Sequence, residues 1–108
     1  MGLLDKGLDI DVLSFAFSVI EGKWKIYILF WLCKSEVMRY SDLRRALGPV
    51  THNVLSSKLK ELEADGLIIR CEYPQVPPKV EYSLSEKGKA FIPVLERLCE
   101  WGETYMEV

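Results

Sequence analysis

The stretch Glu72–Leu84, EYPQVPPKVEYSL, decides the fold of this 108-residue chain. Its second half carries Val80, Tyr82 and Leu84, residue types that favour a pleated, half-buried strand. Its three prolines remove backbone donors and fix φ, so strand pairing stops there and the tip projects as a stiff loop. The stretch therefore predicts a hairpin of two short strands with a proline-rich tip.

The hairpin follows a helix that ends in Asp65-Gly66, and Arg70 and Lys79 place positive charge near it. A helix followed by a projecting basic hairpin is the arrangement of a winged helix-turn-helix, in which the hairpin is the wing. We therefore predict a mainly α-helical protein with a small β wing over residues 68–84, a single domain spanning residues 1–108. The arrangement implies a nucleic acid partner.

The helix before the wing is predicted over residues 51–65, with Thr51 as its N-cap. Its apolar residues recur at i, i+4 and i+7 and form one stripe towards the core: Leu55, Leu59 and Leu62. A shorter helix begins at Ser41, the predicted N-cap, and ends at Gly48-Pro49. The two helices, joined by a brief turn, form the predicted helix-turn-helix.

Helices predicted at the two ends, approximately residues 11–21 and 86–107, carry more apolar surface than a small monomer covers. Asp11 is the predicted N-cap of the first. Pairing of two copies across a two-fold axis would cover this surface and present two recognition helices to palindromic DNA. The alternative is that both helices fold back onto one core. The predicted dimer interface comprises Leu13, Phe15, Phe17, Phe91, Leu95, Leu98, Trp101 and Tyr105.

The net charge of −2 conceals an uneven distribution along the chain. Residues 22–60 hold eight basic and two acidic residues, a net charge of +6, whereas the remainder carries −8. Association with a polyanion depends on local potential, so a basic middle segment is compatible with DNA. The same charges on ordinary solvated helix surfaces are the simpler alternative.

Other classes of protein lack support in the sequence. Cys33, Cys71 and Cys99 are odd in number and widely spaced, which argues against a disulfide framework or a structural zinc site and favours a reducing cytoplasm. Each is expected to be a small buried side chain. The first residues show no secretory signal, and the longest apolar stretch, 24–33, interrupted only by Lys25, is too short to span a bilayer. No acid, base and nucleophile are spaced as in an active site, so neither an enzyme nor a cofactor is expected.

Several segments resemble the HxlR-type winged helix-turn-helix regulators of bacteria and archaea. They are IEGKWK (20–25), RYSDLR (39–44), LKELEADGLI (59–68), the wing residues Tyr73-Pro74 and 76–84, Gly88, PVL (93–95) and WG (101–102). The resemblance covers roughly residues 11–108. It implies a homodimeric transcription factor that contacts its partner copy through the first and last helices and DNA through the helix at 51–65 and the wing.

The chain departs from this family at one position. Many relatives carry a Cys-Pro pair at the start of the first helix, and some sense oxidants through that thiol, but Asp11 and Val12 stand here. The resemblance therefore implies no thiol sensing by that route.

We expect sequence-specific binding of double-stranded DNA, with the recognition helix in the major groove and the wing on adjacent backbone or minor groove. Asn53 can pair with adenine, Ser56 and Ser57 can contact bases or phosphates, and His52 can make a neutral polar contact. Basic side chains would mainly contact phosphate. The full predicted DNA-binding set is Arg39, Ser41, Arg44, Arg45, Thr51, His52, Asn53, Ser56, Ser57, Lys58, Lys60, Arg70 and Lys79.

Two alternatives remain open at the level of sequence. A winged helix that binds another protein and never touches DNA would suit the overall acidity. A regulator with a small-molecule effector would place its ligand between the terminal helices and a central helix predicted over about residues 23–34. Trp24, Trp31 and Trp101 are candidate lining residues there. Aromatic packing in the core explains these tryptophans equally well.

Overall fold

The computed structural model describes residues 7–107. The expectation that the first residues show no secretory signal falls largely on residues 1–6, outside the described part. Five helices and three strands follow one another along the chain. They are α1 (Ile10–Ile20), α2 (Lys23–Ser35), β1 (Val37–Arg39), α3 (Tyr40–Leu47), α4 (His52–Ala64), β2 (Ile68–Tyr73), β3 (Lys79–Leu84) and α5 (Glu86–Tyr105).

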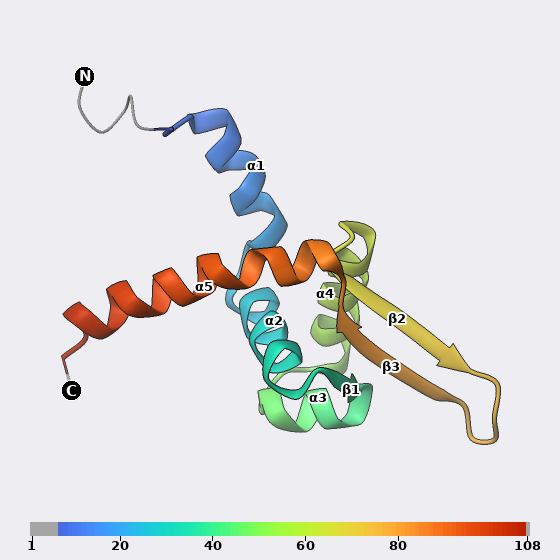
Figure 1. The fold of residues 1–108 in the computed structure, drawn as a ribbon. Coiled ribbons are helices and arrows are strands. Elements are labelled where there is room, and N and C mark those ends of the chain that lie inside the picture. The colour runs from blue at the N-terminus through green and yellow to red at the C-terminus, as the bar shows by residue number, and fades with distance from the viewer. Residues whose placement is uncertain (1–6, 108) are drawn as a thin grey trace.

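Three arms project from a small helical body (Figure 1). α2, α3 and α4 form the body, the β2–β3 hairpin extends to one side, and α1 and α5 leave in other directions. The molecule measures 60 × 34 × 23 Å along its principal axes. This arrangement confirms the predicted winged helix-turn-helix with its helical ends.

The wing belongs to a three-stranded antiparallel sheet with strand order β1-β3-β2. β2 pairs with β3 from Ile68 opposite Leu84 to Tyr73 opposite Lys79. The sequence predicts only these two strands, with a short extended link over residues 37–40. β1 instead pairs along β3, with Met38 opposite Tyr82, and ties the base of the wing to α3.

The core lies between α2, α3, α4 and the base of the sheet. α2 runs through its centre, and Ile28 and Leu29 are fully buried. The predicted stripe on α4 is confirmed, because Leu55, Leu59 and Leu62 are all buried. Leu43 and Leu47 of α3 complete the inner faces of the helix-turn-helix. Burial of a leucine side chain contributes about 1.5–3 kcal/mol, so this cluster fixes the position of α4.

Gly88 sets how α5 leaves the body. A Cβ atom at this position would lie 2.1 Å from the carbonyl oxygen of Leu67, so only glycine permits the observed packing. Ser85, the N-cap of α5, accepts a hydrogen bond from the Gly88 amide at 3.0 Å. Lys87 donates to the Asp65 carbonyl at 2.7 Å. The start of α5 is thereby joined to the turn that ends α4.

Two of the predicted helix caps are wrong. Asp9, not Asp11, caps α1, because its carboxylate accepts from the backbone N–H groups of Asp11 and Val12. At α3 the N-cap residue is Arg39, with no side-chain cap, because the chain passes straight from β1 into the helix and leaves Ser41 inside the first turn. Thr51 caps α4 as predicted, accepting from the Val54 amide at 3.2 Å.

The expectation of buried cysteines is also wrong. Cys33, Cys71 and Cys99 are all free and exposed. They lie on solvent-exposed faces of α2, β2 and α5. Residue type alone does not reveal which face of an element a position occupies. Among residues 7–107 no helix is both long and apolar enough to cross a membrane.

Candidate nucleic-acid interface

The outer face of α4 is polar and accessible. Opposite its buried leucine stripe lie the exposed side chains of His52, Asn53, Ser57 and Lys60. The helix begins at His52, so the first backbone N–H groups point outward from this end. Such an end favours a phosphate or an acceptor on a base.

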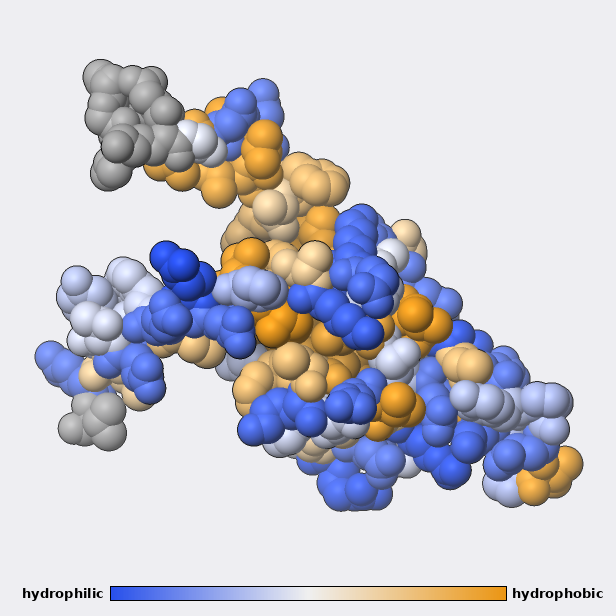
Figure 2. Space-filling view, in the orientation of Figure 1, coloured by the Kyte–Doolittle hydropathy of each residue, from blue (hydrophilic) through white to orange (hydrophobic). Residues whose placement is uncertain are grey.

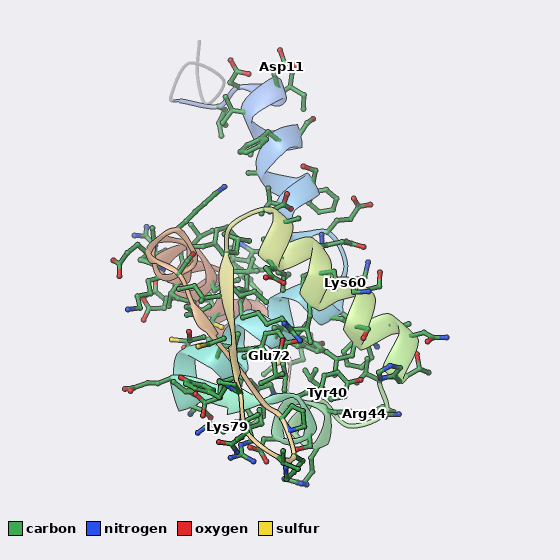
Figure 3. The ribbon with its side chains drawn as sticks, turned by 90° about the vertical axis from the view of Figure 1, so that its right-hand side faces the viewer. Asp11, Tyr40, Arg44, Lys60, Glu72 and Lys79 are labelled. Atoms are coloured by element: carbon green, nitrogen blue, oxygen red, sulfur yellow. The ribbon has the colours of Figure 1, made fainter. Side chains whose placement is uncertain are left out.

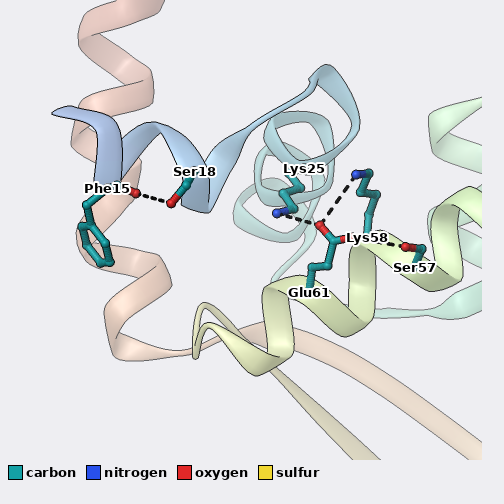
Figure 4. Close-up of polar contacts among 6 residues, drawn as sticks. All are labelled: Phe15, Ser18, Lys25, Ser57, Lys58 and Glu61. Carbon is teal, nitrogen blue, oxygen red and sulfur yellow. Dashed lines mark hydrogen bonds and ion pairs between the residues drawn. The ribbon is translucent and has the colours of Figure 1, made fainter. Parts of the chain in front are cut away.

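An ion-pair network attaches α4 to the centre of the body (Figure 4). Lys25 of α2 is only 4% exposed, and its ammonium lies 2.9 Å from Glu61 Oε1. The same carboxylate oxygen lies 3.6 Å from Lys58 Nζ, and Ser57 donates to Oε2 at 3.2 Å. A buried ammonium requires a partner, so Glu61 serves the core as well as the surface.

This network also determines the charge state of Glu61. The hydrogen bond from Lys25 lowers the pKa of the Glu61 carboxyl, with further lowering from the charges of Lys25 and Lys58 and from Ser57; desolvation opposes the shift. The carboxylate is therefore held ionised. Ser57 and Lys58, both predicted DNA contacts, are already engaged with it in the free chain.

A second polar contact joins the starts of α3 and α4. The Tyr40 hydroxyl lies 2.5 Å from Nδ1 of His52. The two rings meet edge to face, with centroids 5.5 Å apart and planes at 69°. Tyr40 is half-buried against the core, whereas His52 is exposed. Figure 3 shows Tyr40 beside Arg44, in the lower half of the view with the wing, and Asp11 far away on α1.

The basic residues near α3 are exposed, but they differ in whether they pair with a carboxylate. Arg45 Nη1 lies 3.2 Å from the Asp42 carboxylate, an exposed pair that is easily exchanged for phosphate. Among residues 7–107, Arg39 and Arg44 make no ion pair. Ser41 lies exposed in the first turn of α3.

A polar groove of about 350 Å³ separates α4 from the wing. Ser56 and Lys60 line it from the helix, and Arg70 and Tyr82 line it from the strands. Arg70 Nη1 lies 3.2 Å from Glu72, which balances part of its charge. The groove brings together three of the predicted DNA contacts from two separate elements.

The wing carries balanced charge towards its tip. Lys79 lies 3.6 Å from Glu81 and stacks over the Tyr73 ring, 4.7 Å from its centroid. Cys71, together with Glu81, raises the pKa of Tyr73 to about 12, so its hydroxyl stays protonated and available as a donor. Val76 at the tip is 100% exposed. Both predicted wing cations, Arg70 and Lys79, are thus paired with carboxylates in the structure.

The predicted dimer residues divide into two groups. Figure 2 shows hydrophobic side chains gathered on α1 and between α1 and α5, while the side of α3 and the wing is mostly hydrophilic. No residue of α1 is buried, and Phe15 is 64% and Trp101 65% exposed. Leu95 differs, since it is 9% exposed within the core of the single chain. The exposed members are Leu13, Phe15, Phe17, Leu98, Trp101 and Tyr105, and Phe91 is half-buried beside Phe15.

The candidate effector-site tryptophans are not brought together. Trp24 and Trp31 pack against the core, whereas Trp101 lies near the end of α5. A groove of about 810 Å³ lies elsewhere, between α2, the sheet and α5, where Leu32, Cys33, Val37 and Ile92 line it. The core-packing explanation therefore accounts for Trp24 and Trp31, and an effector stays a prediction.

Three residues that hold the side chains of this surface in place were not predicted from the sequence: Lys25, Tyr40 and Glu61. One signal was available, because a lysine among the apolar residues of 24–33 requires an oppositely charged partner when it is buried. Nothing in the spacing indicated which acid would supply it.

Comparison with known proteins places this geometry in a family. Residues 19–108 match the HxlR-like helix-turn-helix family. The chain belongs to the HxlR family. An HTH-type transcriptional regulator of Halalkalibacterium halodurans is 54% identical over 89 residues, covering 82% of this chain and 79% of that protein. YdzF of Bacillus subtilis, also an HTH-type transcriptional regulator, is 48% identical over 82% of each chain. HxlR relatives are thus transcriptional regulators rather than enzymes.

Solved structures of HxlR relatives share the fold. The HTH-type transcriptional regulator YtcD superposes with a TM-score of 0.83 at 44% identity, over 87% of this chain and 95% of that one. The oxidised redox regulator HypR superposes with a TM-score of 0.80 at 41% identity, over 89% and 98%. These likenesses confirm the winged helix-turn-helix predicted from the sequence.

Proposed function

We propose that this HTH-type regulator binds double-stranded operator DNA in the cytoplasm as a homodimer. In this proposal α4 enters the major groove and the wing lies on adjacent backbone or minor groove. The operator is pseudo-palindromic, because a two-fold dimer presents two equivalent helices. One observation carries the proposal: α4 buries its apolar face and leaves its polar face exposed, and Ser56 and Lys60 on that helix line a groove together with Arg70 of the wing.

The side chains divide by chemistry into two roles. Asn53, His52 and the Ser56–Ser57 pair lie at the start of α4, where side chains of recognition helices reach base edges. The cations surround them and contact phosphate, which positions the protein without reading sequence. Thr51 keeps its capping role and Ser41 offers a hydroxyl to the backbone. The proposed phosphate contacts are Arg39, Arg44, Arg45, Lys58, Lys60, Arg70 and Lys79.

Two substitutions on α4 test this division of roles. Asn53→Ala should weaken binding to the selected operator by roughly 1–3 kcal/mol and relax preference at one base pair. Lys60→Ala should weaken binding to all duplexes about equally and reduce the slope of log K against log salt by about one. The measurement is fluorescence anisotropy over a salt series, on an operator selected from fragments of the source genome and on its scrambled duplex.

Glu63→Ala supplies a matched control, because Glu63 is exposed on α4 and forms no ion pair among residues 7–107. Its removal should not weaken binding to either duplex. Equal losses for Asn53→Ala and Lys60→Ala on both duplexes would reject the assignment of base and phosphate contacts. No binding to any genomic fragment at low salt would reject the proposal and favour a protein-interaction module.

The proposed dimer rests on the apolar side chains that the single chain leaves exposed on α1 and α5. Contiguous patches of this kind mark interaction surfaces. The exposed apolar residues of α1 and α5 therefore support the proposed docking of a partner copy on these two helices.

A further inference from the structure

We infer that Tyr40 fixes the tautomer of His52, so that the recognition helix presents an Nε2–H donor to a base acceptor in DNA. The inference rests on the proposed function and adds to it a determinant of specificity. It also assigns a role to a tyrosine that itself lies outside the predicted DNA-binding set.

The geometry makes Tyr40 the fixed member of the pair. Its ring packs against the core at the start of α3, while the His52 ring is exposed at the first turn of α4. The hydroxyl reaches Nδ1 at 2.5 Å, and the edge-to-face ring contact limits rotation of the imidazole. Among residues 7–107, Nε2 has no hydrogen-bond partner, so that nitrogen remains available at the surface.

The chemistry of the contact selects one tautomer. A neutral imidazole has one N–H and one acceptor nitrogen, and the bond made by one nitrogen determines the state of the other. A phenolic hydroxyl is a stronger donor than acceptor, so it donates to Nδ1. The proton of the imidazole then resides on Nε2. A protonated ring keeps the same donor, because both its nitrogens carry hydrogen.

The tautomer decides which atoms on the base edges His52 can contact. An Nε2–H donor matches N7 of a purine, O6 of guanine or O4 of thymine in the major groove. The opposite tautomer would present an acceptor and would match the amino groups of adenine or cytosine instead. Tyr40 therefore acts as a positioning residue for specificity, through His52.

The tautomer is measurable without DNA, because the chain contains a single histidine. Nitrogen-15 NMR of the imidazole at about pH 8, above the ordinary titration range of histidine, separates the two ring nitrogens. The wild-type chain should show protonation of Nε2 alone, and Tyr40→Phe, which keeps the ring, should show a mixture of tautomers. Tyr27→Phe is the matched control, since it removes an exposed hydroxyl from α2, and should match the wild type. A Nδ1–H tautomer in the wild type, or an unchanged ratio in Tyr40→Phe, would overturn the inference.

A double-mutant series connects the tautomer with DNA binding. His52→Ala should weaken operator binding roughly three- to tenfold, the range of one neutral hydrogen bond, and Tyr40→Phe about threefold. His52→Gln retains an amide donor that does not depend on Tyr40, so Tyr40→Phe should have no further effect in that background. Removing the contacted acceptor should abolish the difference between His52→Ala and wild type; the analogues are 7-deazapurine for N7, 2-aminopurine for guanine O6 and 5-methyl-2-pyrimidinone for thymine O4.

The outcomes separate this inference from the proposed function. Loss of operator binding by the wild-type chain would reject DNA binding, whatever the NMR result. Normal operator binding with additive, independent losses for the two substitutions would reject the positioning role alone. A loss for His52→Ala that persists with every analogue duplex but disappears with methylphosphonate linkages would reject base contact by His52.

Discussion

The body, formed by α2, α3 and α4, and the two terminal helices, α1 and α5, differ in how far their apolar side chains are buried. In the body, apolar side chains are buried, and the buried Lys25 ammonium has its partner in the Glu61 carboxylate. In the arms, α1 buries none of its residues, and α5 leaves its far half with Trp101 and Tyr105 exposed. The body is complete as a single chain, and the arms are not.

This difference assigns the proposed specificity for DNA to the body and the proposed assembly of two copies to the terminal helices. A position fixed by core packing can hold side chains at a constant height and angle for a groove, as α4 does for His52 and Asn53. An apolar surface without an internal partner contributes nothing until another surface covers it. Substitutions should therefore damage the two regions through different observables.

The largest effect is expected where the two regions join. Gly88→Ala places a methyl group 2.1 Å from the Leu67 carbonyl, so the start of α5 must move away from the end of α4. We expect a loss of about 3 kcal/mol in the free energy of unfolding, at the upper end for overpacking of a rigid site. Urea denaturation followed by circular dichroism measures this loss.

Ala90→Gly, two residues further along α5, is the control for Gly88→Ala. Ala90 is exposed, and its loss should cost no more than about 1 kcal/mol, the intrinsic helix preference for alanine over glycine. A Gly88→Ala protein as stable as Ala90→Gly would contradict the tight junction between body and arm.

A second test addresses the arms alone. Replacing Phe15 and Trp101 by serine removes exposed apolar surface without touching the core. We expect the doubly substituted chain to stay folded but to become monomeric at about micromolar concentration, as measured by analytical ultracentrifugation. Operator affinity should fall by at least about tenfold, because each half-site is then bound alone.

Val76→Ser is the control for that experiment, because Val76 is equally apolar and fully exposed but lies at the wing tip. It should leave the molecular mass of the assembly unchanged. A doubly substituted chain that sediments as the wild type does would show that the apolar faces of the arms are not the assembly surface.

The smallest of the three effects concerns the attachment of α4. Glu61→Gln leaves the buried Lys25 with a neutral acceptor, and we expect a loss of about 1–2 kcal/mol in stability. The value is below that of a fully buried pair because the Glu61 side chain is 44% exposed and screened by water. Glu63→Gln, two residues further along α4, should change stability by less than about 0.5 kcal/mol.

The dependence on pH has a defined sign. Because the folded chain lowers the pKa of Glu61 from 4.5, its stabilising contribution is present above that value and is lost as pH falls through the folded pKa. The wild-type chain should therefore lose stability more steeply with acidification than Glu61→Gln does. Parallel acid titrations of unfolding for the two proteins would contradict the role of the carboxylate.

Much of the fold follows from local patterns, and the failures are also informative. The leucine stripe of α4, the Thr51 cap and the proline-rich wing tip are local in sequence, so periodicity and turn chemistry predict them. The pairing of β1 with β3 joins segments more than forty residues apart, and a three-residue strand carries no pattern of its own.

The candidate site shows the same division between local and distant information. Exposure of the α4 side chains follows from the position of the leucine stripe, and the predicted contacts His52, Asn53, Ser57 and Lys60 are indeed exposed. The ion pairs that occupy Lys58, Arg70 and Lys79 depend on which carboxylates the fold brings near. Such pairs form between flexible side chains, and helical or strand spacing only partly determines them. The direct bond from Tyr40 to His52 crosses two elements and has no sequence signal at all.

α1 has one further consequence. An isolated helix of eleven residues is marginal in water, because closing its first turn costs more than the few later turns return. In a lone chain the amide protons of α1 should exchange with solvent far faster than those of α2, and partner contact should slow them. In the proposed dimer, helix formation at this end would then increase with the concentration of the chain.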